Sequence, residues 1–213
     1  MKDIDIKDIL RKIHERQMNP LYSAKEFFQD DLPKKQRKFD LPKRHRGLYW
    51  IWSNLDLGKL GDMRQREPSK NEIPFSELIS QRRDLNCTCE IHHNKYPGFI
   101  IRYNGIGGHG KTTPTAARFG LRERIEQGFN STHKKTGALK LKSRTGYDEK
   151  NWAVSYFNFD DDKNWEIIKP LADNPDKDDP SDPEVIKLIY SNYANALELC
   201  WRIYYGTPIL TRK

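Results

Sequence analysis

The chain has 213 residues and a net charge of +8, and an acidic segment over 160–184 leaves the rest of the surface markedly basic, which favours nucleic acid as a partner. Three cysteines are too few for a disulfide framework, so we expect a reducing, cytoplasmic environment. The charged first residues exclude a secretion signal, and no apolar run reaches the ~18 residues that a membrane-spanning helix needs.

The first half of the chain alternates between amphipathic and β-forming runs, which are separated by stretches that contain Pro and Gly. In chain order, these patterns predict a helix over 3–18, a basic loop to residue 46, a strand over 47–53, a loop over 54–74, a short helix over 75–83, and strands over 85–92 and 96–104.

The elements predicted for the second half are a Gly-rich turn over 105–110, a helix from Pro114 to Phe129, a basic loop over 130–148, a strand over 152–159, an acidic surface loop over 160–180 and a long final helix. Ser181 and Glu184 match a capping box, so that helix should begin near Pro183 and end before Gly206. Together these elements predict an α+β fold with a mainly antiparallel central sheet flanked by helices.

Two tyrosine motifs and one helix are the most informative features. Gly47-Leu48-Tyr49 opens the apolar run LYWIW, Tyr103-Asn104-Gly105 closes the run FIIRYNG, and the helical run LRERIEQGF follows. Two strands that each present a tyrosine, with a helix that presents an arginine, can surround a phosphodiester with hydroxyls and a fixed positive charge. In these motifs the chain resembles the GIY-YIG nucleases, from Gly47 to the C-terminus and with long insertions.

The resemblance implies a small GIY-YIG-like core in which Tyr49 and Tyr103 are the catalytic tyrosines and Arg124, with Arg118 as a fallback, is the catalytic arginine. Glu198 resembles the glutamate that binds one divalent metal, Mg²⁺ or Mn²⁺, and hard oxygen ligands suit Mg²⁺. Tyr49 would accept or relay the proton of the attacking water. That role needs nearby positive charge, from Arg124, Lys111 or the metal, to lower its pKa.

The chain departs from the family pattern in three places. Gly128 lies one turn after Arg124, where the family often has His or Tyr, so His109 or His133 would have to substitute. The two tyrosine motifs are much farther apart than in the minimal module. The asparagine expected near the C-terminus is absent, and Thr211 lies close to its place.

No separate DNA-reading domain is visible, so we divide the chain into an N-terminal helix and basic arm over 1–46 and a nuclease domain over 47–213 with an insertion at 54–98. This arrangement resembles type II restriction endonucleases, which implies site-specific cleavage of double-stranded DNA to 5′-phosphate and 3′-hydroxyl ends. It also implies a homodimer and a cognate methyltransferase in a prokaryotic cytoplasm. The predicted DNA-binding residues are Lys43, Arg44, Arg46, Arg64, Arg66, Arg82, Arg83, Lys134, Lys135, Lys140, Lys142 and Arg144.

Two other interpretations stay open. The chain is a basic nucleic-acid-binding protein without catalysis, or it is a nucleotide hydrolase, because residues 105–112 read GIGGHGKT and satisfy the pattern of a phosphate-binding loop with Lys111. Cys87, Cys89, His92 and His93 lie close enough to bind zinc, although their spacing does not match the usual structural sites. Alternation along a strand would instead place both cysteines in the core.

Overall fold

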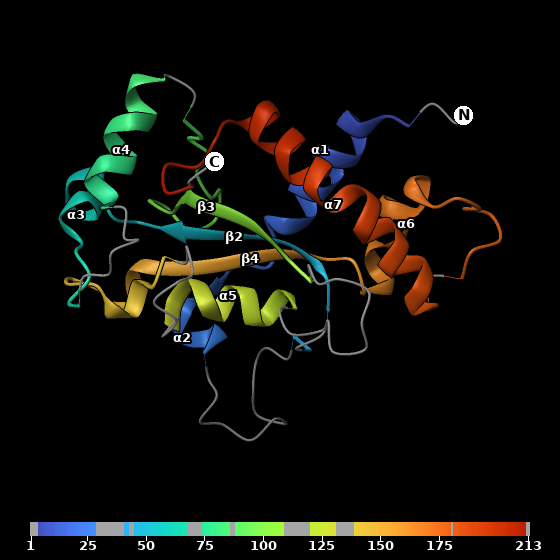
Figure 1. Cartoon of the computed structure of the whole chain (residues 1–213), viewed down its shortest axis with the longest axis horizontal. Coiled ribbons are helices and arrows are strands. Elements are labelled where there is room, and N and C mark those ends of the chain that lie inside the picture. The colour runs from blue at the N-terminus through green and yellow to red at the C-terminus, as the bar shows by residue number, and fades with distance from the viewer. Residues whose placement is uncertain are drawn as a thin grey trace.

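The computed structural model describes residues 4–28, 41–42, 45–67, 74–85, 88–108, 120–130, 139–179 and 181–211. Within these ranges, one four-stranded sheet is flanked by seven α-helices (Figure 1). The strand order is β1-β4-β2-β3, and every neighbouring pair is antiparallel. The predicted α+β class with an antiparallel central sheet is therefore confirmed.

The sheet consists of β1 (Tyr22–Ser23), β2 (Gly47–Ser53), β3 (Ile100–Gly107) and β4 (Trp152–Asn158). Strand β2 lies between β3 and β4, so Tyr49 stands opposite Gly105 on one side and Tyr156 on the other. Every residue of β2 is buried. This explains why its sequence is a continuous apolar run rather than an alternating one.

Helices cover both faces of the sheet (Figure 1). Alternation along β2 sends Trp50 and Trp52 into one core and Ile51 into the other. The core of Trp50 is closed by α1 (Ile6–Gln17), α6 (Trp165–Ile168) and α7 (Pro183–Tyr205). The core of Ile51 is closed by α2 (Ala24–Phe27), α3 (Leu57–Asp62), α4 (Phe75–Asp84) and α5 (Leu121–Asn130).

Two predicted elements of the first half differ from the structure. The strand predicted over 85–92 is wrong: its described residues form only isolated bridges, and β3 begins later than predicted, at Ile100, after a turn with Gly98 at φ +85°. The loop predicted over 54–74 contains α3, because the Asp56 carboxylate accepts a hydrogen bond from the Lys59 amide and caps its first turn.

The second half also differs in detail. Gly105 and Gly107 belong to β3 rather than to a turn, and α5 begins at Leu121, whereas Pro114 lies outside the described residues. The acidic segment is not simply a surface loop, since it forms short helical turns that bury Trp165 in the core. Helix α7 is capped by Asp182, whose carboxylate accepts from the Glu184 amide, and not by Ser181.

The sequence pattern did not reveal β1 or α2. Ser23 and Glu26 form a reciprocal capping box that starts α2, and β1 pairs with β4 at the edge of the sheet. Ile9 and Ile13 of α1 are buried in the core that also holds Trp50. No helix in the described part of the chain is long and apolar enough to cross a membrane.

Candidate active site

The two predicted catalytic tyrosines lie together on neighbouring strands. The β2–β3 register places Tyr49 opposite Gly105 and Ile51 opposite Tyr103, so the two tyrosines are diagonal neighbours. Their ring centroids are 5.9 Å apart, and the ring planes are tilted by 36°. Gly105 makes room for this pair, because a Cβ there would lie 2.7 Å from the Tyr49 Oη and Cζ.

Burial raises the pKa of both tyrosines, and it raises the pKa of Tyr49 well above the ordinary value. The charge of Arg124 lowers both pKa values, and the charge of Glu198 raises both. Arg124 and Glu198 are therefore each within electrostatic reach of both tyrosines, although the four side chains come from β2, β3, α5 and α7. At neutral pH both phenols are protonated, so both can act as hydrogen-bond donors.

Arg124 is partly buried on α5, whose apolar face is Leu121, Ile125 and Phe129. Its Nη1 donates to the Gln127 Oε1 at 3.3 Å. One turn later, a Cβ on Gly128 would lie 3.1 Å from the Cδ1 of Ile51. The helix thus packs close to β2 at the position where the family often has a proton carrier. The suggested substitutes His109 and His133, and the fallback Arg118, lie outside the described residues.

Glu198 lies beside the buried face of α7 that holds Leu197 and Trp201. Its Oε1 accepts from the Arg202 Nη2 at 2.7 Å, and each of these side chains is 15% exposed. Burial raises the pKa of Glu198, and Arg202 opposes that shift. The other glutamate of this helix, Glu184, is exposed and pairs with Lys187 one turn away.

Asn104 is a site residue that sequence reasoning missed. It is 2% exposed, and its Oδ1 accepts from the Arg202 Nε at 3.0 Å and from the Thr211 hydroxyl at 3.3 Å. Thr211, which lies near the expected place of the family asparagine, therefore reaches the same cluster. A buried amide is costly unless it has partners, but polar Arg102 and Tyr103 precede Asn104 in β3, so no local signal set it apart.

Tyr190 is a third tyrosine near this cluster, and it was also missed. It is 3% exposed on α7, two turns before Glu198, and its hydroxyl has no hydrogen-bond partner among the described residues. Burial raises its pKa, while Arg124 lowers it and Glu198 raises it. Nothing in the sequence sets this position apart, and nothing in it shows that its hydroxyl lacks such a partner.

Several predicted DNA-binding residues have structural roles instead. Arg144 is fully buried: its Nε and Nη1 donate to the carbonyls of Leu139 and Met63, both at 2.9 Å, and its guanidinium lies 3.6 Å from the Phe75 ring centroid. The prediction that Arg144 contacts DNA is therefore wrong. Lys140 is also largely buried, at 7% exposed, and its backbone is in a left-handed conformation at φ +52°.

Arg46 and Arg82 are engaged as well. Arg46 pairs with Asp160 at 3.3 Å and donates to the Pro183 carbonyl at 3.1 Å, and Arg82 donates to the Thr211 carbonyl at 2.8 Å. The remaining described members of the predicted set are exposed, namely Arg64, Arg66, Arg83 and Lys142. The predicted residues outside the described ranges are Lys43, Arg44, His109, Lys111, Lys134 and Lys135.

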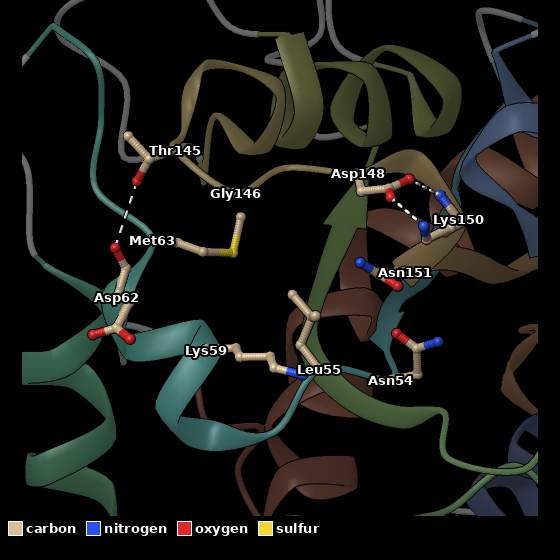
Figure 2. Close-up of a pocket in the computed structure, with 10 residues that line it drawn as sticks. All are labelled: Asn54, Leu55, Lys59, Asp62, Met63, Thr145, Gly146, Asp148, Lys150 and Asn151. Atoms are coloured by element: carbon tan, nitrogen blue, oxygen red, sulfur yellow. Dashed lines mark hydrogen bonds and ion pairs between the residues drawn. The ribbon is translucent and has the colours of Figure 1, made fainter.

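A surface cavity of about 710 Å³ lies between α3 and the 145–151 turn (Figure 2). Charged side chains line it, among them Lys59 and Asp62, and an ion pair at 2.8 Å joins Asp148 to Lys150. Its lining begins just beyond the end of β2 and includes none of the tyrosines, Arg124 or Glu198. The cavity and the tyrosine cluster are thus separate features.

The residues considered for zinc are not arranged as a metal site. Cys89 is buried in the core, which raises the pKa of its thiol to about 11. The His93 Nε2 lies 2.8 Å from the Met18 carbonyl oxygen, and its Nδ1 accepts from two backbone amides. The described part of the chain has no group of three or more metal-binding side chains, and Cys87 lies outside it.

Two of the three described glycines of the phosphate-loop pattern lie in a strand and not in a loop, and Gly108 follows that strand. Gly105 and Gly107 pair with Tyr49 and Gly47 in the antiparallel ladder. A phosphate-binding loop instead follows a strand and leaves its amides free for the ligand. Residues 109–112 of the pattern lie outside the described ranges.

No protein-family model, no curated protein and no solved structure matches this chain. A functional assignment therefore depends on the residues and contacts of the tyrosine cluster itself.

Proposed function

We propose that the chain is a divalent-metal-dependent DNA endonuclease of the GIY-YIG type, acting as a type II restriction enzyme. One observation carries this proposal: the β2–β3 register packs the rings of Tyr49 and Tyr103 together, 5.9 Å apart, and the charges of both Arg124 and Glu198 act on them. Two hydroxyls, a cation and a carboxylate are the groups that phosphodiester hydrolysis needs.

Arg124 is the group that would bind the non-bridging oxygens of the scissile phosphate, since charge-assisted hydrogen bonds to phosphate are strong and directional. The protonated hydroxyls of Tyr49 and Tyr103 would donate to the phosphate or to the attacking water. Arg124 lowers both pKa values, so it also favours the proton relay that we assign to Tyr49.

Glu198 is the residue that would hold Mg²⁺ or Mn²⁺, because a carboxylate is a hard oxygen ligand. The described residues include no group of three or more metal-binding side chains. A site with one protein carboxylate fits Mg²⁺, which usually keeps several waters and takes other ligands from substrate phosphates. When bound, the metal supplies Lewis-acid stabilisation of the leaving oxygen.

The substrate we propose is double-stranded DNA, cut to 5′-phosphate and 3′-hydroxyl ends at a specific site. Exposed Arg64, Arg66, Arg83 and Lys142 remain available for phosphate or base contacts. A homodimer would suit a palindromic site, and a methyltransferase of the same specificity would protect the host DNA.

The test is cleavage of unmethylated phage DNA with Mg²⁺ by the wild type, Glu198→Gln and Glu184→Gln. Glu184 is the matched control, because it is an exposed carboxylate on the same helix. We expect discrete fragments from the wild type and from Glu184→Gln, and intact DNA from Glu198→Gln. Tyr49→Phe and Arg124→Ala should each slow cleavage by roughly 100-fold or more.

Equal cleavage by Glu198→Gln would overturn the assigned metal ligand. Intact DNA from every variant, with DNA binding that falls steeply as salt rises, would favour the alternative of a basic DNA-binding protein without catalysis. The net charge of +8 supports that alternative, although it does not account for the buried tyrosine pair.

A further inference from the structure

The ion pair between Glu198 and Arg202 differs from an ordinary helix surface pair. The Arg202 Nη2 lies 2.7 Å from the Glu198 Oε1, and both side chains are only 15% exposed. The same i,i+4 spacing occurs between Arg11 and Glu15 on α1 at 2.6 Å, where the side chains are 54% and 59% exposed. Because solvent screens the buried pair less, its attraction is stronger.

Arg202 is also held from the sheet. Its Nε donates to the Asn104 Oδ1 at 3.0 Å, and the Thr211 hydroxyl donates to the same oxygen at 3.3 Å. Asn104 follows Tyr103 directly on β3 and is buried, which is costly for an amide without partners. The two donors satisfy the buried side-chain oxygen of Asn104.

We propose that Arg202 is an internal counter-ion of the site: it occupies Glu198 in the DNA-free protein and releases that carboxylate to a divalent cation when a phosphodiester binds its guanidinium. This inference rests on the proposed nuclease function. In this exchange each charged group keeps a partner of opposite charge. The Glu198 carboxylate binds the metal in place of the guanidinium, and the Arg202 guanidinium binds the phosphate in place of the carboxylate. Guanidinium groups bind both anions in the same planar, bidentate way.

Arg202 is accessible for this exchange. It lines a surface cavity of about 470 Å³ at the C-terminal end of α7, together with the exposed side chains of Leu199 and Ile203. An anion that enters this cavity can reach Arg202 without opening the core of the sheet.

The consequence is positive coupling between metal and DNA. A guanidinium in contact with Glu198 repels a divalent cation, so metal binding is weak until a phosphate draws Arg202 away. Because coupling between two ligands is reciprocal, the metal must tighten DNA binding by the same factor. The protein would thereby avoid holding a tightly bound metal in the absence of substrate.

The test is calorimetric titration of DNA-free protein with MnCl₂, using the wild type, Arg202→Gln and Arg11→Gln. Arg11→Gln is the matched control, because it removes the same charge from an exposed pair of the same spacing. We expect Arg202→Gln to bind Mn²⁺ roughly 10-fold more tightly or better, and Arg11→Gln to match the wild type. Glu198→Gln should abolish the site in every background.

A second titration, with dimethyl phosphate as the phosphodiester probe, should tighten Mn²⁺ binding to the wild type and leave Arg202→Gln unchanged. Unchanged or weaker Mn²⁺ binding by Arg202→Gln would overturn the counter-ion role. If Arg202→Gln does not fold, Asn104→Leu serves instead, since it loosens Arg202 and should tighten Mn²⁺ binding; no tightening there also overturns the role.

These outcomes are separate from the nuclease test. A wild type that cuts DNA while Arg202→Gln binds Mn²⁺ no better loses the counter-ion role alone. A wild type that leaves DNA intact loses the nuclease function, whatever the titrations show.

Discussion

Gly105→Ala should disrupt the tyrosine pair by a direct clash with the Tyr49 ring. The added methyl would lie 2.7 Å from both the Cζ and the Oη of Tyr49, closer than real Cβ atoms approach other heavy atoms. Tyr49 is 5% exposed, so its ring cannot swing into solvent and must tilt against the core. We expect a cost of about 1–3 kcal/mol in the free energy of unfolding, typical of overpacking, and the loss of most cleavage activity.

The assay is chemical denaturation of four proteins: the wild type, Gly105→Ala, Tyr49→Leu and the double variant. With the phenol ring removed, Gly105→Ala should cost about 0.5 kcal/mol or less, because contacting residues are not additive. Gly61→Ala is the control, since its Cβ would meet nothing closer than 3.7 Å and it lies in α3, where alanine is favoured. An equal cost of Gly105→Ala with and without the Tyr49 ring would refute this reasoning.

Three further predictions follow from buried polar groups. Arg144→Ala should lower the free energy of unfolding by about 3 kcal/mol or more, because it leaves two buried carbonyls without donors, and it should leave the salt dependence of DNA binding unchanged. Arg64→Ala should instead leave the stability unchanged and reduce the slope of the salt dependence by about 1. An unchanged stability of Arg144→Ala would contradict the structural role of Arg144. Tyr190→Phe and Tyr147→Phe each remove a buried hydroxyl that has no hydrogen-bond partner in the described part of the chain. Chemical denaturation should therefore show a free energy of unfolding that is unchanged or raised by up to about 1 kcal/mol. A clear loss of stability would mean that the hydroxyl has a partner. Burial lowers the pKa of His14, so folding favours the neutral imidazole and the stability of the protein should fall as the pH drops below about 6.5. Melting curves of His14→Gln, recorded as a function of pH, should show a smaller loss of stability in this range. An equal loss in the wild type and His14→Gln would contradict the prediction.

Strand β2 could be predicted because burial on both faces makes it continuously apolar, and β4 could be predicted from its alternation. Neither signal needs knowledge of the partner strands. Segment 85–92 was wrongly predicted to be a strand because its pattern of buried residues resembles that of a strand. Cys89 and His93 are buried at spacing that resembles a strand, but distant groups hold them: the Cys89 amide donates to the Thr207 carbonyl, and the His93 ring lies against the Met18 carbonyl. Alternating burial records which side chains are covered and not whether a ladder forms.

The same distinction applies to the site. Tyr49, Tyr103 and the helix of Arg124 carry a local pattern, so the amino-acid sequence alone is enough to select them. Asn104 and Arg202 could not be selected in this way, since each is explained only by the other, and nothing local joins a β3 residue to the end of α7. The prediction for Arg144 was wrong for the opposite reason. A run of charged residues is typical of an exposed surface, and nothing in the sequence shows that one of its members points inward and donates to buried carbonyls.

The position of β4 has a consequence for biosynthesis. Strand β2 contains LYWIW, a run with high β-propensity, no charge and no proline, which is the composition of segments that self-associate when exposed. One of its two partners, β4, is made about a hundred residues later, at Trp152–Asn158. A nascent or truncated chain that ends before Trp152 therefore presents an unpaired edge of this run. We expect such fragments to aggregate or to bind chaperones until β4 is made and pairs with the free edge of β2.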